Sequence, residues 1–223
     1  MAELHDLIPL TAGMIISPLP VVAVVAILLS PRGRVAAPVY TATFTVASLV
    51  AIAIGAIGSA SLPASRTNGS PVSFALAIVL FVAFTALAIA SWVTRPRAGA
   101  TPVAPKWLAA IDTITPARAA SLGLVMAIVN TKNIPLDLKG GALIGEAHLP
   151  IVAALGLCAA IAVASSLLLI VPTIAAANGS AATTRRLERL KDDMIAHNSE
   201  MMAVLFAILA ANEAAAIVHQ LTS

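Results

Sequence analysis

Long apolar runs, each separated from the next by a short polar segment, dominate the chain. Six of these runs are long enough for a helix that crosses a bilayer, which needs about 20 mainly apolar residues. They cover residues 7–29, 35–60, 72–93, 119–144, 151–177 and 201–221. The runs are continuous rather than alternating, and they are far longer than a barrel strand of about 10 residues. The pattern therefore predicts an all-α polytopic membrane protein with six transmembrane helices.

Basic residues in the loops predict how these helices are oriented. The first, third and fifth loops together hold 10 of the 13 Lys and Arg residues, namely Arg32, Arg34, Arg95, Arg97, Lys106, Arg118, Arg185, Arg186, Arg189 and Lys191. Short loops rich in Lys and Arg stay in the cytoplasm. We therefore expect a multi-pass protein of the cytoplasmic (inner) membrane with both termini extracytoplasmic. A count of five spans would move the fifth loop to the other side and remove the bias.

Composition narrows the possible classes of protein further. The chain is 60% hydrophobic and 10% charged, whereas soluble domains carry about 25% charged residues. Its net charge of +3 is spread over short loops and indicates no nucleic-acid partner. The single cysteine, Cys158, can form neither an intrachain disulfide nor a cysteine metal cluster. With no nucleophile–base pair, metal-ligand cluster or phosphate loop, we expect a transporter rather than an enzyme, without a metal or other cofactor.

Two of the predicted spans are interrupted by helix-breaking residues. The first contains Ser17-Pro18-Leu19-Pro20, and the fourth contains Asn130-Thr131-Lys132-Asn133-Ile134-Pro135. Three spans separate the starts of these two elements, and an odd number reverses the direction across the membrane. We therefore predict two inverted three-helix repeats with broken helices 1 and 4, an arrangement that places a transport site near the bilayer midplane. Within one transmembrane domain, residues 1–94 form repeat one, 95–118 a cytoplasmic linker, and 119–223 repeat two.

The two breaks supply the candidate substrate-binding residues, which are Ser17, Pro18, Pro20, Asn130, Thr131, Lys132, Asn133 and Asp137. A lysine at membrane depth costs roughly 2.5–3.5 kcal/mol on insertion scales, so it normally faces a cavity or a partner. Lys132 and the flanking amides suit a phosphate or sulfate group. Asp137 lies one helical turn after Asn133 and is either a proton carrier or a static partner of the lysine. Glu213 in the last span has the same two interpretations.

Two loops have the spacing of short amphipathic helices. Residues 106–115 place Trp107, Ile111 and Ile114 on one face, and residues 184–197 place Leu187, Leu190 and Met194 on one face. Both segments either lie at the level of the cytoplasmic headgroups or form solvated linkers.

At its two breaks the chain resembles the actinobacterial GAP family, the peptidoglycolipid- and sulfolipid-addressing proteins of the lysine-exporter transporter superfamily. The resemblance rests on residues 16–20 and 29–34 and on residues 130–133 followed by Gly140-Gly141. The family pattern at the second break is Asn-Pro-Lys-Asn, and Thr131 replaces its proline here. The resemblance implies a protein that moves cell-envelope glycolipids outward, beside a larger lipid exporter.

Three functions are compatible with these residues. The first is a transporter or flippase for an anionic cell-envelope lipid, glycolipid phosphate or lipid-linked sugar phosphate, with membrane lipids around it. The second is an exporter of small cationic solutes or metal ions, for which the spans offer only Asp137 and Glu213 as acidic ligands. The third is an accessory scaffold subunit of a lipid-export complex. A homodimer is compatible with each of the three.

Overall fold

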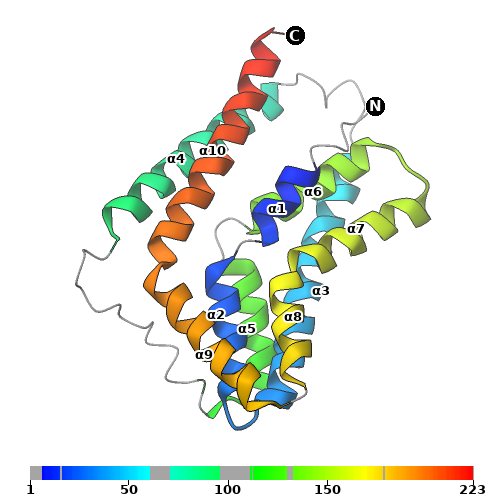
Figure 1. Cartoon of the computed structure of the whole chain (residues 1–223). Coiled ribbons are helices and arrows are strands. Elements are labelled where there is room, and N and C mark those ends of the chain that lie inside the picture. Colours follow the sequence, from blue (N-terminus) through cyan, green and yellow to red (C-terminus); the bar gives the residue numbers. More distant parts are fainter. Residues whose placement is uncertain are drawn as a thin grey trace. The chain divides into compact units, whose positions relative to one another are not determined.

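The computed structural model describes residues 7–15, 17–60, 71–95, 111, 113–129, 133–177 and 179–222. The regular elements of these residues are helices, and none of them is a strand (Figure 1). Along the chain the helices are α1 (Leu7–Ile15), α2 (Pro18–Leu29), α3 (Gly33–Ala60), α4 (Pro71–Val93), α5 (Pro116–Val129), α6 (Asn133–Glu146), α7 (Ile151–Ser165), α8 (Leu167–Ala176), α9 (Ala181–Ala196) and α10 (Asn198–Thr222). The predicted linker helix over residues 106–115 lies largely outside the described residues.

The chain divides into two compact units. Unit 1 comprises Met1–Ala60 and Val103–Ala196, so it contains α1 to α3 and α5 to α9. Unit 2 comprises Ser61–Pro102 and His197–Ser223, and it contains α4 and α10. The third predicted span of each half therefore falls in unit 2, and the other four predicted spans fall in unit 1.

Helix α3 is the central helix of unit 1, with α5 and α6 packed along it. Glycines allow these backbones to approach closely, because a side chain would fill the space between them. A Cβ atom built at Gly141 of α6 would overlap the carbonyl oxygen of Ile52, and one built at Gly123 of α5 would lie 2.6 Å from the carbonyl oxygen of Tyr40. The later contact on α3, at Ile52, is made by the later glycine, Gly141, and the earlier contact, at Tyr40, by the earlier glycine, Gly123. The segment formed by α5 and α6 therefore runs parallel to α3.

The fifth predicted span is not one straight helix. It divides into α7 and α8, whose axes differ by 63°, and Ser166 lies between them. The hydroxyl groups of Ser165 and Ser166 both donate to the carbonyl oxygen of Ala162, at 2.9 Å each. Such back-bonding by serine bends helices, and Pro172 removes a further backbone donor from α8. The sequence predicted breaks in the first and fourth spans only, so this bend in the fifth span is an additional finding.

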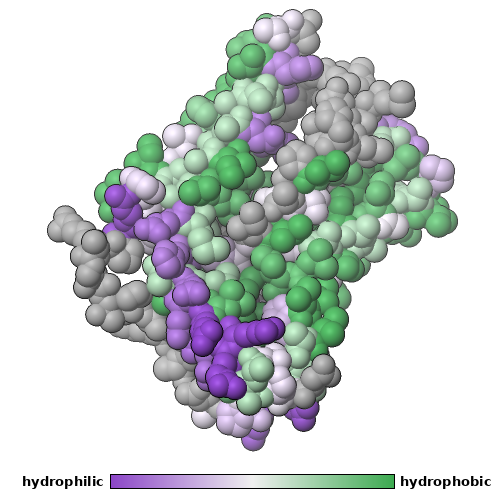
Figure 2. All heavy atoms as spheres, viewed as in Figure 1, coloured by the Kyte–Doolittle hydropathy of each residue, from purple (hydrophilic) through white to green (hydrophobic). Residues whose placement is uncertain are grey.

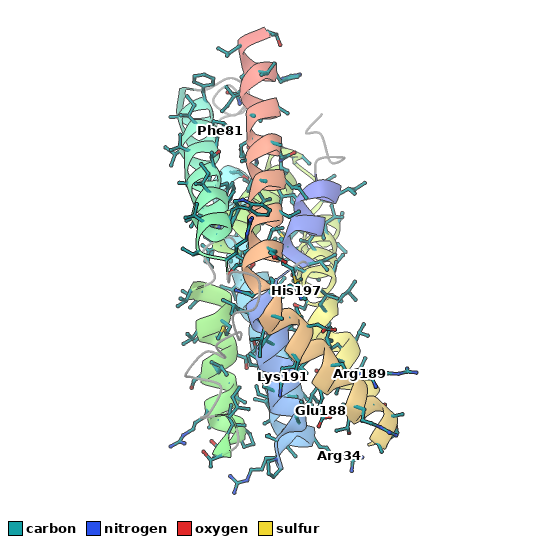
Figure 3. The ribbon with its side chains drawn as sticks, turned by 60° about the vertical axis from the view of Figure 1, so that its left-hand side comes forward. Arg34, Phe81, Glu188, Arg189, Lys191 and His197 are labelled. Atoms are coloured by element: carbon teal, nitrogen blue, oxygen red, sulfur yellow. The ribbon has the colours of Figure 1, made fainter. Side chains whose placement is uncertain are left out.

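The second predicted amphipathic helix is confirmed as α9. Leu187 and Met194 of this helix are buried, and α9 packs against α2 and α8 of unit 1. Leu190 is 40% exposed, so the apolar stripe is narrower than the spacing predicted. Figure 2 shows hydrophilic residues along the outer surface of α9, and Figure 3 shows Glu188 and Arg189 pointing away from it.

Unit 2 is a pair of apolar helices, α4 and α10, in contact along their sides. The rings of Phe84 and Phe206 stack between them, with centroids 6.1 Å apart and planes inclined by 21°. Aromatic pairs in this geometry add to the stabilisation that burial provides.

The lengths and surfaces of the helices identify a membrane protein. Helices α3 and α10 are each long and apolar enough to cross a membrane, and there are up to four such spans if the bent pairs α5–α6 and α7–α8 each count as one. Helix α2 and residues 77–93 of α4 are apolar but shorter. Large apolar side chains of α3 and α7 stay exposed, including Ile54, Ile57 and Val152 at 58%, 71% and 79%. Exposed apolar side chains in such number suit a lipid environment.

One end of unit 1 collects basic residues. It consists of the α2–α3 turn with Arg32 and Arg34, the start of α5 with Arg118, and the start of α9 with Arg185 and Arg186, all exposed. A guanidinium nitrogen of Arg34 donates to the carbonyl oxygen of Ala177 at 2.8 Å, which joins the α2–α3 turn to the end of α8. Residues 147–150, which connect α6 to α7 at the other end, contain neither Lys nor Arg.

Candidate functional site

The first break falls between α1 and α2, immediately before the two prolines. Ser17 has an extended-type backbone at φ −135° and ψ 89°, and it is buried. Pro18 and Pro20 lie in the first turn of α2, where the missing N–H of proline leaves no helical hydrogen bond unmade. The prolines thus start a new helix rather than kink a continuous one. The hydroxyl of Tyr40 on α3 donates to the Pro20 carbonyl oxygen at 3.1 Å and fixes this turn.

The second break separates α5 from α6, whose axes differ by 72°. The predicted site residues Asn130, Thr131 and Lys132 lie outside the described residues. Asn133 begins α6, and Asp137 follows one turn later on the same face; they are 3% and 1% exposed. The Oδ1 atom of Asn133 has no hydrogen-bond partner among the described residues. Polar groups buried in this way are usually hydrogen-bonded, so Asn133 is suited to bind a ligand group.

The helices on either side of the two breaks lie next to one another. Helix α1 packs on α6, since a Cβ atom at Gly140 would lie 3.3 Å from Met14 Cε and 3.4 Å from Leu10 Cδ2. Helix α2 packs on α5. The helix before one break therefore meets the helix after the other, so the two broken segments run antiparallel and change direction at a similar level. The start of α2 after Ser17 and the start of α6 at Asn133 therefore lie at a similar level in unit 1.

Glu213 does not belong to the same unit as these residues. It lies on α10 of unit 2, where it is 3% exposed. Proton coupling by Asp137 and Glu213 stays a prediction.

Sequence patterns did not identify two buried serines that the structure places in unit 1. Ser48 is 1% exposed in the middle of α3, and Ser166 is fully buried at the α7–α8 bend. A signal was present for Ser48, because it lies on the helical stripe between Phe44 and Ile52, both of which are buried. For Ser166 the available signal was a Ser-Ser pair within an apolar run.

A cation site would need several His, Cys, Asp or Glu side chains close together as metal ligands. Among the residues that the structure describes, no three of these side chains come together as a group that could hold a metal ion. The described part of the chain thus gives the cation-exporter alternative no acidic or imidazole cluster to build on.

Comparison with known proteins gives one match that covers most of the chain. The model of the family described as Sap, sulfolipid-1-addressing protein, matches residues 7–217. No curated protein and no solved structure matches. The matched region includes both breaks and all ten described helices except the last residues of α10.

Proposed function

We propose that the chain, which belongs to the sulfolipid-1-addressing protein family, is a transporter or flippase for an anionic cell-envelope lipid. The lipid would be a sulfated or phosphorylated glycolipid, or a lipid-linked sugar phosphate. The family description supports a role with lipids, and the geometry of the two breaks supports transport.

One observation carries the transport part of this proposal. Two broken helices lie antiparallel in unit 1, with α1 beside α6 and α2 beside α5. Broken helices paired in this way expose backbone polar groups to a cavity, which is how secondary transporters build substrate sites near the midplane. The buried Asn133 and Asp137 at the start of α6 place side-chain polar groups at the same level.

Within this site Lys132 would supply the positive charge for the headgroup. The amides of Asn130 and Asn133 flank it in the sequence and would donate to the remaining oxygens of a sulfate or phosphate. Ser17, Pro18 and Pro20 would shape the opposite wall, and Thr131 and Asp137 would complete the second break. Asp137 would neutralise Lys132 until the anionic headgroup displaces it.

The six-span inverted repeat is part of the same proposal, and the packing of the helices supports it. In the proposed repeat, α1, α2, α3 and α4 of the first half correspond to α5, α6, α7–α8 and α10 of the second half. When each helix is replaced by its counterpart, the contact of α1 with α6 becomes the contact of α5 with α2, which the structure also contains. Likewise the contact of α2 with α3 becomes that of α6 with α7, and α4 pairs with its own counterpart α10. A pseudo-two-fold axis would produce this pattern.

Orientation follows from the basic end of unit 1. We propose that the end with Arg32, Arg34 and Arg118 faces the cytoplasm, because basic loops are retained there. In the inner membrane it would attract anionic headgroups. Both termini would then be extracytoplasmic.

Cysteine labelling in intact cells should confirm this topology. In a Cys158→Ala background, Ser223→Cys should react with a membrane-impermeant maleimide, whereas Ser180→Cys should react only after permeabilisation. Ser180 is exposed immediately before α9, so a thiol at this position is accessible to the reagent. Labelling of Ser180→Cys alone in intact cells would invert the topology and contradict the repeat assignment.

Transport itself is tested in proteoliposomes. The purified protein should move NBD-labelled galactosylceramide sulfate across the bilayer, so that dithionite quenches more of the fluorescence than in protein-free liposomes. Neutral NBD-galactosylceramide is the matched control and should move more slowly, because it lacks the anionic group. NBD-phosphatidic acid tests an anion without a sugar.

The alternatives are outcomes of the same preparation. Movement of none of the three lipids, together with uptake of radiolabelled cations, would replace lipid transport with cation export. If neither lipids nor cations move, the protein would act as a scaffold subunit of a larger lipid exporter. A homodimer would be seen as a doubled mass in detergent.

A further inference from the structure

Two hydrogen bonds fix how α3 lies against α8. The hydroxyls of Thr41 and Thr173 are 3.2 Å apart, and Arg34 bonds the carbonyl oxygen of Ala177 at 2.8 Å. Since the residue number falls on α8 as it rises on α3, the two helices are antiparallel. Ser48 lies seven residues after Thr41 on α3, and Ser166 lies seven residues before Thr173 at the start of α8. Seven residues return a helix to nearly the same face, so Ser48 and Ser166 face one another at one level.

Both hydroxyls are buried, yet they are not bonded to each other. Ser48 is 1% exposed, and its Oγ atom has no hydrogen-bond partner among the described residues. Ser166 is fully buried and donates to the carbonyl oxygen of Ala162, so its Oγ atom can still accept a hydrogen bond. A buried hydroxyl without a partner costs free energy, and a bound ligand atom would remove that cost.

The level of Ser48 is also the level of the second break. On one side of it along α3, Phe44 contacts the position of Gly123 on α5, and on the other side Ile52 contacts Gly141 on α6. The break between α5 and α6 lies between these two contact points along the chain. Ser48 therefore lies on α3 between the part that packs on α5 and the part that packs on α6.

The same position recurs in the two proposed repeats. Ser48 is the sixteenth residue from the start of α3 at Gly33, and Ser166 is the sixteenth from the start of α7 at Ile151. Each repeat thus contributes one buried hydroxyl at an equivalent depth, and this correspondence is independent of the threonine register.

We propose that Ser48 and Ser166 form a hydroxyl pair that binds the headgroup of the transported lipid. The proposal rests on the proposed function. The Ser48 hydroxyl donates to a headgroup oxygen, and Ser166 accepts from a headgroup hydroxyl. The oxygen belongs either to the anionic ester or to the sugar, and the hydroxyl pair adds hydrogen-bonding selectivity to the charge that Lys132 provides.

Binding of labelled lipids by Ser48→Ala tests the proposal. The probe is NBD-labelled galactosylceramide sulfate, and its affinity for the purified protein is measured by fluorescence anisotropy in a detergent without a sugar headgroup. Loss of a hydrogen bond to a charged oxygen should weaken binding about tenfold or more. The thermal unfolding midpoint should stay the same or rise, because a hydroxyl without a partner is removed.

Ser59→Ala is the matched control on α3. Its hydroxyl donates to the carbonyl oxygen of Ala142 at 2.9 Å, so its loss should lower the unfolding midpoint and leave lipid affinity unchanged. Ser165→Ala is the control for Ser166→Ala, because both hydroxyls bond the same carbonyl oxygen while only Ser166 lies on the face of Thr173. Only Ser166→Ala should weaken binding.

Two further lipids separate the sources of the headgroup oxygen. If Ser48→Ala weakens binding of the sulfated lipid and of NBD-phosphatidic acid, the oxygen belongs to the anionic group. If it weakens binding of the sulfated and the neutral galactosylceramide, the oxygen belongs to the sugar. Wild-type affinity of Ser48→Ala for all three lipids overturns the hydroxyl pair, as does a lowered unfolding midpoint without any loss of binding.

Cross-linking examines the geometry without lipid and keeps the two proposals apart. In a Cys158→Ala background, Ser48→Cys with Ser166→Cys should be joined by dibromobimane, and the probe lipid should slow that reaction. Ser48→Cys with Ser165→Cys should react less. If the wild-type protein binds no probe lipid, both the proposed function and the proposal that the hydroxyl pair binds a headgroup are contradicted. If the two cysteines fail to cross-link, only the proposal that Ser48 and Ser166 face one another is contradicted.

Discussion

Replacing Lys132 with Met should lower lipid transport by about two orders of magnitude or more while leaving the protein folded. Truncating one member of a buried charge pair costs about 2–5 kcal/mol, and the anionic headgroup would lose its main partner. Insertion should be no worse, because removing a charge at membrane depth relieves a cost of roughly 2.5–3.5 kcal/mol. The measurements are movement of NBD-galactosylceramide sulfate in proteoliposomes and elution of the variant as a monodisperse peak.

Two companion variants make this result specific. Lys132→Arg should keep part of the activity, since the charge remains but the guanidinium fork differs in shape from an ammonium. Lys139→Met is the matched control, because it removes a lysine from α6 six residues beyond Asn133. It should transport close to the wild-type rate. Full activity in Lys132→Met would remove the anion site and leave the scaffold role as the better explanation.

Substituting Gly141 with Leu should prevent stable folding of unit 1. A Cβ atom at this position already overlaps the carbonyl oxygen of Ile52 and lies 2.9 Å from the backbone nitrogen of Ala56. Backbone atoms cannot move aside as a flexible side chain can, so α6 would have to separate from α3. Even Gly141→Ala should lower the free energy of unfolding by about 1–3 kcal/mol. Thermal unfolding in detergent measures both changes.

Gly156 provides the control for that substitution. A Cβ atom there meets nothing within 4 Å, and the residue lies inside α7. Gly156→Ala should therefore raise the free energy of unfolding by about 0.5–1 kcal/mol, since alanine is the better helix former. If Gly141→Ala were as stable as Gly156→Ala, the close approach of α3 and α6 would be wrong.

Local chemistry explains which parts of this fold were predictable. Proline lacks a donor wherever it stands, so Pro18 and Pro20 marked the first break without any knowledge of tertiary contacts. The amides and lysine of residues 130–133 marked the second break, because polar residues rarely occur at membrane depth without a reason. In each case the residues themselves cause the interruption, and the start of α2 and the end of α5 fall within a few residues of the prediction.

Features that depend on packing were not predictable from the sequence. The bend at Ser166 arises from side-chain hydrogen bonds to one carbonyl oxygen, a choice that serine makes in some helices and not in others. The exposure of Leu190 depends on how α9 meets α2 and α8, and the periodicity of a helix does not reveal the width of the surface that covers it. Ser48 shares a helical stripe with Phe44 and Ile52, but only the helices that face it make it a candidate site residue.

The bond between Tyr40 and Pro20 gives this protein a spectroscopic reporter. Tyr40 is the only tyrosine in the chain, and its hydroxyl contacts the first turn after the first break at 3.1 Å. Uniform incorporation of 3-fluorotyrosine would therefore give a single ¹⁹F resonance for each conformation of that turn, without any substitution in the sequence. Exchange between the inward-open and outward-open states of the proposed transport cycle would be read directly from the number and line width of those resonances.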